Sequence, residues 1–140
     1  MLEQTFLMIK PDGVKRKLVG DILVKLEKKG LKIVAMKMLQ ITKELAEIHY
    51  REHRGKKFYE ELIKFITSGP VVAIVLEGDE VVKIIRNLAG NTNPKEAECG
   101  TIRGDYAFDL TQNVIHTSDS ITSAKREIIN FFEKAETLDK

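Results

Sequence analysis

Six consecutive apolar residues lie near the middle of the chain, at positions 71–76. A strand with one solvated face alternates apolar and polar side chains, whereas a strand covered on both faces is apolar at every position. The run therefore predicts a central strand in a sheet that carries helices on both sides. It is far shorter than the roughly 20 apolar residues that cross a bilayer, so we expect no membrane-spanning segment.

Strand and helix patterns alternate on either side of this run. Residues 5–9 are apolar and stop at the turn-forming sequence KPDG at 10–13, residues 31–41 are rich in strand-forming side chains, and a short strand is expected at 114–115. The order predicts an α+β fold, a split βαβ sandwich of the ferredoxin-like type whose four-stranded antiparallel sheet is covered by helices. Apolar residues at helical spacing predict helices near 19–29, 42–50, 58–66, 79–88 and 121–132, the second capped by Thr42 and the fourth by Asp79.

The composition is that of one domain without covalent staples. The 140 residues carry 23 Lys and Arg against 21 Asp and Glu, a formal charge of +2, and the single cysteine is Cys99. A chain of this length buries enough surface for a core without disulfides, and no repeat or Pro/Ser-rich linker divides it, so we expect one domain over residues 1–140. No secretory leader opens the sequence and the charges are mixed, which predicts a cytoplasmic location and no specific nucleic-acid partner.

Residues 89–112 form a long segment with little periodicity, and ordered loops of that length commonly carry function. The chain contains neither a Gly-rich phosphate loop nor a serine-hydrolase elbow. It does contain HYREH at 49–53, a match to an H-x-x-E-H zinc pattern in which His49 and His53 would share a zinc ion and Glu52 would act as base. A zinc hydrolase is therefore one hypothesis, although the match lacks a third ligand; the alternative is two polar residues at a helix end.

His116 has a different setting. It follows the last predicted strand and precedes TSDS at 117–120, which leads into the last helix. An imidazole there lies beside a helix N-terminus, where an anion such as phosphate is favoured, and it can act as a nucleophile if a carboxylate holds its other ring nitrogen. Glu127, at the border of the buried face of the following helix, is the candidate carboxylate. The alternative is a satisfied strand-end histidine and a solvated glutamate.

Three cations come from separate segments: Lys10, Arg86 and Arg103. If the fold brings them together they suit a triphosphate, because arginine forks make bidentate contacts with phosphate. Phe58 begins the apolar stripe of its helix, so spacing alone predicts that it is a core residue.

The sequence NVIHTSDS at 113–120 resembles the active-site signature of nucleoside diphosphate kinases. The segments KPDG at 10–13, SGPVV at 68–72, TNP at 92–94 and GTIRGD at 100–105 resemble family segments in the same order, and the likeness runs over about residues 5–132. The resemblance implies a ferredoxin-like sandwich and an enzyme that moves the terminal phosphate of a nucleoside triphosphate onto His116 and then onto a second diphosphate. This is a ping-pong cycle with broad base specificity.

The resemblance also implies residue roles. His116 is expected to be the nucleophile through its δ nitrogen, Glu127 to accept a hydrogen bond from the other ring nitrogen, and Ser118 to support Glu127. The residues expected to hold the nucleotide are His53 near the phosphates, Phe58 and Leu110 on the two faces of the base, and Lys10, Tyr50, Arg86, Thr92, Arg103 and Asn113 on the phosphates and ribose hydroxyls.

The implied cofactor is Mg²⁺, which would bridge the nucleotide phosphates with few protein ligands and which Asp119 would reach through water. The implied partners are nucleoside triphosphates and diphosphates and further copies of this chain, most commonly in a hexamer and sometimes in a tetramer or dimer.

A few positions depart from the family pattern. Thr117 stands where glycine is usual, and because a β-branched residue tolerates positive φ poorly, we expect an extended backbone there. The others, which concern loop rigidity and subunit contacts more than chemistry, are Thr111 and Gln112 in place of a Gly-Arg pair, Cys99 in place of proline and Leu76 in place of tryptophan.

A hypothesis from another class is a noncatalytic nucleotide- or nucleic-acid-binding module on the same fold. It would bind nucleotides without transferring phosphate. The sequence has no basic, aromatic-interleaved sheet face that would favour it.

Overall fold

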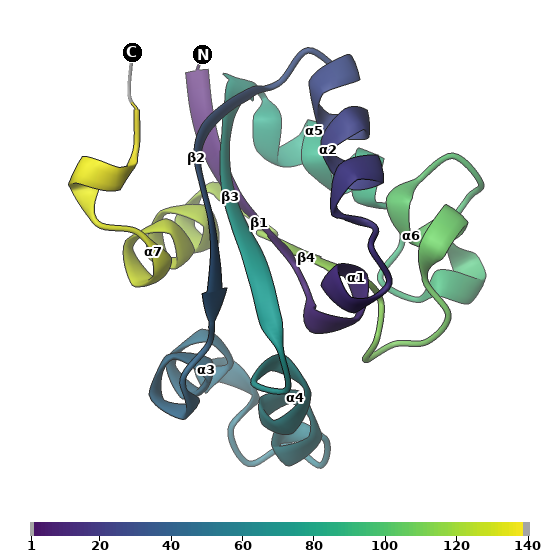
Figure 1. The fold of residues 1–140 in the computed structure, drawn as a ribbon, viewed down its shortest axis with the longest axis vertical. Coiled ribbons are helices and arrows are strands. Elements are labelled where there is room, and N and C mark those ends of the chain that lie inside the picture. The colour runs from purple at the N-terminus through teal and green to yellow at the C-terminus, as the bar shows by residue number, and fades with distance from the viewer. Residues whose placement is uncertain (1, 139–140) are drawn as a thin grey trace.

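The computed structural model describes residues 2–138. Four strands form one antiparallel sheet in the order β2-β3-β1-β4 (Figure 1). The predicted α+β fold with a four-stranded antiparallel sheet is therefore confirmed. The strands are β1 (Leu2–Ile9), β2 (Lys32–Gln40), β3 (Pro70–Asp79) and β4 (Ile115–Thr117).

Helices cover both faces of the sheet (Figure 1). One apolar cluster joins the sheet to α3, α4 and α7, and a second joins its other face to α2, α5 and α6. No helix within residues 2–138 is long and apolar enough to cross a membrane. The helices are α1 (Pro11–Lys15), α2 (Val19–Lys28), α3 (Lys43–His49), α4 (Tyr59–Ile66), α5 (Val81–Ala89), α6 (Ile102–Tyr106) and α7 (Ile121–Phe131), with short 3-10 helices η1 (Arg51–His53), η2 (Pro94–Glu96) and η3 (Lys134–Glu136).

Strand β3 has the double burial that its apolar run predicted. It lies between β2 and β1, and its successive side chains enter the two clusters in turn, since side chains alternate between the faces of a sheet. Val71, Ala73 and Val75 belong to the cluster under α3, α4 and α7, and the residues between them belong to the other. Leu76, which stands where the family often has tryptophan, is fully buried in the second cluster.

Some local predictions were wrong. The KPDG segment at 10–13 is not a simple turn, because Pro11 occupies the first turn of α1 and Asp12 follows it there, as suits a residue without an N–H at a helix start. Asp79 does not occupy the N-cap of α5: β3 extends through it, and Glu80 takes that position with φ 51°. The segment 89–112 contains η2 and α6, and Thr101 caps α6 by accepting a hydrogen bond from the Gly104 N–H at 3.0 Å.

Candidate active site

A cavity of about 290 Å³ lies where β1 and β4 end, beside the segment from α3 to α4 and the chain that precedes β4. It brings together residues from segments far apart in the sequence. Of the residues predicted for the site, Ser118 does not line it and lies behind Glu127. The predicted residues that do line it are Lys10, Tyr50, His53, Phe58, Arg86, Thr92, Arg103, Leu110, Asn113, His116, Asp119 and Glu127.

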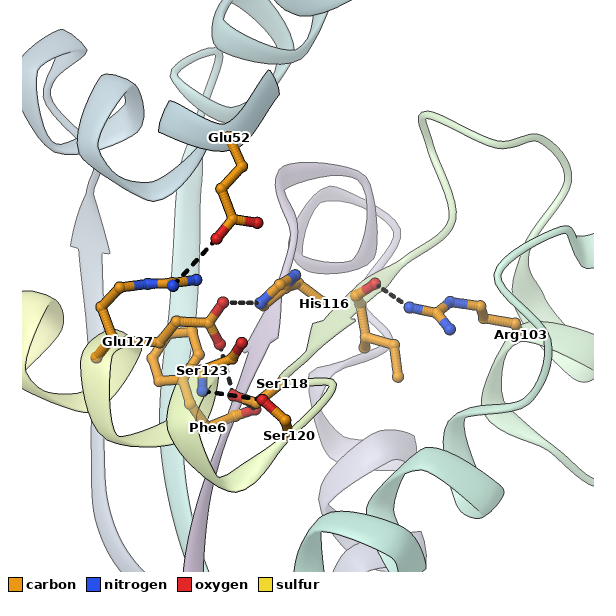
Figure 2. A network of polar contacts seen from close by, with 10 residues as sticks. Phe6, Glu52, Arg103, His116, Ser118, Ser120, Ser123 and Glu127 are labelled. Carbon is orange, nitrogen blue, oxygen red and sulfur yellow. Dashed lines mark hydrogen bonds and ion pairs between the residues drawn. The ribbon is translucent and has the colours of Figure 1, made fainter. Parts of the chain in front are cut away.

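His116 and Glu127 are in direct contact (Figure 2). His116 lies in β4 opposite Met8 of β1, and Glu127 lies on α7, which begins after Ser120 caps it with a hydroxyl that accepts from the Ser123 N–H. The Nε2 atom of His116 lies 3.0 Å from Oε2 of Glu127. The hydroxyl of Ser118 donates to the other carboxylate oxygen at 2.5 Å.

The contacts of Glu127 determine its charge. Burial raises the pKa of Glu127, but the hydrogen bond and charge of His116 and the hydroxyl of Ser118 outweigh that effect, so the pKa lies below its ordinary value. The carboxylate is therefore ionised at neutral pH and accepts a hydrogen bond from Nε2 of His116, which carries the proton. Nδ1, the other ring nitrogen, then keeps its lone pair.

Lys10 and Asn113 form a second polar pair in the cavity. Lys10 follows the last residue of β1, and its Nζ atom donates to Oδ1 of Asn113 at 2.9 Å. The amide of Asn113 in turn donates to the carbonyl of Thr92 at 3.2 Å. Burial, and after it the nearby charge of Arg103, lowers the pKa of Lys10 to about 8.

Arg103 is a buried cation held by main-chain carbonyls. Only 4% of its surface is exposed, and it donates to the carbonyl oxygen of Gly90 at 2.9 Å. It also donates to the carbonyl oxygen of Ile115 at 3.0 Å, the contact drawn from Arg103 in Figure 2. Burial, and then the charge of Arg86, lowers its pKa to about 10. Arg86 and Arg103 thus both supply positive charge to one cavity. The hydrogen bonds of Arg103 go to carbonyl oxygens, so carboxylates neutralise little of its charge.

An apolar pair lies at the open side of the cavity. Phe58 is 48% exposed and precedes α4 as its N-cap, and Leu110 is 61% exposed. The prediction from spacing alone, that Phe58 belongs to the core, is therefore wrong, because the helix begins one residue later and leaves the ring outside its buried face. The ring of His53 lies 6.0 Å from that of Phe58.

Tyr50 also lines the cavity. Its burial, and after that the charge of Glu127, raises the pKa of Tyr50, so its hydroxyl stays protonated.

His49 is a cavity residue that the sequence analysis did not assign to the phosphate site. Its ring lies edge-to-face against that of His116, with centroids 4.5 Å apart. Both of its ring nitrogens are buried without a hydrogen-bond partner among the described residues, and burial, followed by His116, lowers its pKa to about 3. It is therefore a neutral packing partner of His116. The one sequence signal that could have found it is its place beside Tyr50, which was assigned to the site.

Arg126 is another cation that the sequence analysis missed. It lines the cavity from α7, and its guanidinium pairs with the carboxylate of Glu52 at 3.1 Å (Figure 2). The pair joins α7 to the segment between α3 and α4. In the sequence, Arg126 lies two residues after Ala124, which is buried, and next to Glu127. This position did not distinguish it from a solvated charge.

The zinc-hydrolase hypothesis lacks its ligand pair. Helix α3 ends at His49, and His53 lies in η1, so the two imidazoles do not share consecutive turns of one helix. Among residues 2–138, the group of His, Cys, Asp and Glu close enough to share a metal ion is His49, His116 and Glu127, within 4.8 Å of one another. His53 is not part of it.

Thr117 has the extended backbone that its β-branched side chain predicted. It pairs with Leu7 as the last residue of β4, and it is absent from the described residues that have positive φ. Strand geometry at this position therefore does not require glycine.

Comparisons with known proteins agree with this fold and show the family. A family model described as nucleoside diphosphate kinase matches residues 3–137. A nucleoside diphosphate kinase of Saccharolobus islandicus is 57% identical over 136 residues, 97% of this chain and 99% of its own length. One of Listeria welshimeri is 61% identical over 137 residues, 98% of this chain and 93% of its own length.

Solved structures give the same result. The nucleoside diphosphate kinase of Halobacterium salinarum, in complex with CDP, has a TM-score of 0.97 and 49% identity, covering 100% of this chain and 93% of that one. The enzyme of Aquifex aeolicus has a TM-score of 0.96 and 38% identity, covering 99% of this chain and 100% of that one.

Fold, cavity and relatives together define a nucleotide-binding kinase, a member of the transferases. The chain belongs to the nucleoside diphosphate kinase family, and it transfers the γ-phosphate of a nucleoside triphosphate to a nucleoside diphosphate. The prediction of an enzyme is confirmed, and a noncatalytic binding module does not describe it.

Proposed function

We propose that this kinase works by a ping-pong cycle in which His116 carries the phosphate between two nucleotides. The observation that supports this most is the contact of its Nε2 atom with Glu127 at 3.0 Å. A carboxylate that holds the proton on Nε2 makes Nδ1 the nucleophilic nitrogen and stabilises the positive charge that the ring gains on phosphorylation.

The transfer of phosphate to His116 forms one bond and breaks one, and it needs only the nucleotide and the cavity residues. The Nδ1 lone pair of His116 forms a bond to the γ-phosphorus, the bond from that phosphorus to the bridging oxygen breaks, and the diphosphate leaves with the electron pair. Glu127 keeps its hydrogen bond to Nε2 throughout. The second diphosphate reverses the step when its terminal oxygen attacks the phosphohistidine.

We assign the remaining cavity residues to nucleotide binding. Phe58 and Leu110 offer exposed apolar surface for the two faces of a base, and stacking accepts any base, which supports broad base specificity. The polar residues proposed for the phosphates and ribose are Lys10, Tyr50, His53, Arg86, Thr92, Arg103 and Asn113.

Mg²⁺ fits this cavity as a cofactor carried by the nucleotide. Glu127 is engaged by His116 and Ser118, and Glu52 by Arg126. Asp119 is thus the cavity carboxylate best suited to hold the ion through water, and the hydrogen bond from Ser123 keeps its pKa below the ordinary value. When bound, Mg²⁺ would neutralise phosphate charge. Residues 2–138 offer no all-carboxylate cage in this cavity, which suits an ion that retains its waters.

The test is a labelling experiment. The purified protein is incubated with ATP labelled at the γ-phosphate and with Mg²⁺, freed of nucleotide, and examined for an acid-labile label that GDP discharges as GTP. We expect this label in the wild type and, at a reduced rate, in His53→Gln, because His53 is proposed to bind the nucleotide and not to carry the phosphate. We expect no label in His116→Gln with an unchanged circular dichroism spectrum. A label that survives in His116→Gln would refute the assignment of the nucleophile.

We also propose the setting in which the enzyme works. Exposed apolar side chains on the edge strand β2, Met36 at 51% and Met38 at 61%, support a homo-oligomer, with a hexamer favoured over a tetramer. The exposed thiol of Cys99 suits the reducing cytoplasm. Residues 1–140 would act as one domain in each subunit. Light scattering on the purified protein measures the subunit number directly.

A further inference from the structure

The KPDG segment at 10–13 contributes Lys10 to the proposed nucleotide site, and the proposed function uses none of its other residues. Asp12 is only 7% exposed, yet it does not line the cavity that contains His116. A carboxylate buried away from the reacting groups needs a partner that justifies its desolvation. That partner is the main chain just before β4.

The main chain at Val114 is strained. Val114 has φ 76°, a region that a β-branched residue rarely occupies. The N–H of Ile115 donates to the carbonyl of Asn113 at 2.9 Å, so Val114 is the central residue of a three-residue turn with positive φ, which is a rare and costly γ-turn. Such strain persists only where surrounding contacts hold it.

Asp12 supplies one of those contacts. Its Oδ2 atom accepts a hydrogen bond from the buried N–H of Val114 at 3.1 Å. The N–H of Lys10 donates to the carbonyl of Val114 at 2.8 Å. Both main-chain polar groups of the strained residue Val114 are thus held by residues 10 and 12. Gly13 leaves room for this residue, since a Cβ there would lie 3.1 Å from the Val114 carbonyl oxygen.

Val114 lies between two cavity residues. Asn113, which immediately precedes Val114, accepts from the Nζ atom of Lys10, and His116 lies two residues after Val114 in β4. A change in φ at Val114 would rotate these two side chains relative to each other. The direction in which Nδ1 of His116 points therefore depends on the turn.

We infer that Asp12 is a positioning residue: through its hydrogen bond to the Val114 N–H it holds the left-handed turn that aims His116 and Asn113 at the nucleotide. The inference rests on the proposed role of His116 as phosphate acceptor. What matters is the location of the acceptor oxygen of Asp12, and its negative charge is secondary.

Two substitutions separate location from charge. Asp12→Asn retains a carbonyl oxygen of the same reach without the charge, whereas Asp12→Glu retains the charge but moves the acceptor by one methylene. We expect Asp12→Asn to keep kcat within about threefold of wild type and Asp12→Glu to lower it roughly 10- to 100-fold, because a misplacement of about 1 Å can cost on the order of 100-fold. The KM for nucleotide should change far less than kcat in both variants.

The competing explanation is that Asp12 acts by its charge on Lys10, whose pKa that charge raises. In that case Asp12→Asn would lose activity, the basic limb of its pH profile would shift to lower pH, and Asp12→Glu would be the active variant. That outcome overturns the inference. The inference is also overturned if Asp12→Asn and Asp12→Glu both melt at a lower temperature but keep wild-type kcat and wild-type rates of histidine phosphorylation.

A double-mutant cycle tests the turn without relying on either variant alone. Glycine adopts positive φ readily, so Val114→Gly needs less support from Asp12. Asp12→Ala lowers the single-turnover phosphorylation rate by some factor in each background. We expect this factor to be at least about five times smaller in the Val114→Gly background than in wild type. Equal losses in both backgrounds would contradict the inference. If wild type itself takes up no acid-labile phosphate, the proposed function fails; if wild type is labelled and the losses are equal, only the role of Asp12 fails.

Discussion

Removal of the Ser118 hydroxyl should destabilise the protein in a way that depends on pH. Ser118 is 1% exposed and donates to the buried carboxylate of Glu127 at 2.5 Å, with a longer contact of 3.4 Å to the Phe6 carbonyl. A hydrogen bond to a buried charge contributes roughly 1.5–3 kcal/mol. We therefore expect Ser118→Ala to lower the free energy of unfolding by about 2 kcal/mol at neutral pH.

The sign of the pH dependence follows from Glu127. Its pKa in the folded protein lies below the ordinary value, so its ionised form contributes stability that is complete above the unfolded pKa and is lost as pH falls through the folded pKa. Without the Ser118 hydroxyl, the folded pKa of Glu127 moves up and less stability remains to be lost. The difference between wild type and Ser118→Ala should therefore shrink below about pH 4.

Urea denaturation at neutral pH and at the lowest pH where both proteins stay folded measures this difference. Ser68→Ala is the control for the loss of a serine hydroxyl from an exposed site, because the Ser68 hydroxyl donates to an uncharged carbonyl, that of Phe65, at 2.6 Å. Its effect should be about 1 kcal/mol or less and the same at both pH values. An equally large effect of Ser118→Ala at both pH values would refute the reasoning, since the hydroxyl would then not be acting on the charge of Glu127.

Further predictions concern the nucleotide cavity. The value of kcat/KM should fall as pH rises through about 8, where Lys10 loses its charge, and a profile that stays flat to pH 10 would contradict this. Thr117→Gly should cost about 0.5–1 kcal/mol of stability in urea titrations, because glycine loses more backbone freedom on folding than any other residue, with no gain in kcat. Phe58→Ala should raise KM by about tenfold for purine and pyrimidine nucleotides alike, given roughly 1–3 kcal/mol per stacked base; a loss confined to one base in steady-state assays would argue against stacking.

The sequence predicted those parts of the fold that depend on which side of an element meets solvent. The apolar run at 71–76 gave the doubly covered strand β3, and helical spacing gave α2, α3, α4, α5 and α7. Element ends were less certain, since a cap depends on local geometry: Thr42 caps α3 as expected, accepting from the Leu45 N–H, whereas Asp79 was displaced from the cap of α5 by the extension of β3. Short α1 and α6 have too few turns for a periodic signal.

The candidate site was predicted by residue type and by the ordered segments that resemble the family, and the structure gathers these residues around one cavity. Spacing could not decide whether His116 and Glu127 meet, since they lie eleven positions apart with a turn between them. The 3.0 Å contact exists because β4 lies beside β1 at the edge of the sheet and α7 packs over β1.

The local sequence pattern determined which segments are buried and which side chains can do chemistry, because the periodicity of apolar residues shows only which side of a helix or strand faces solvent. Tertiary structure alone decided what those side chains touch. It set the neutral ring of His49 against His116, exposed Phe58 at the mouth of the cavity, and brought Asp12 to the Val114 N–H across 102 positions of sequence. Such contacts depend on how helices and strands close over one another, and their cost in strain is offset only in the assembled fold.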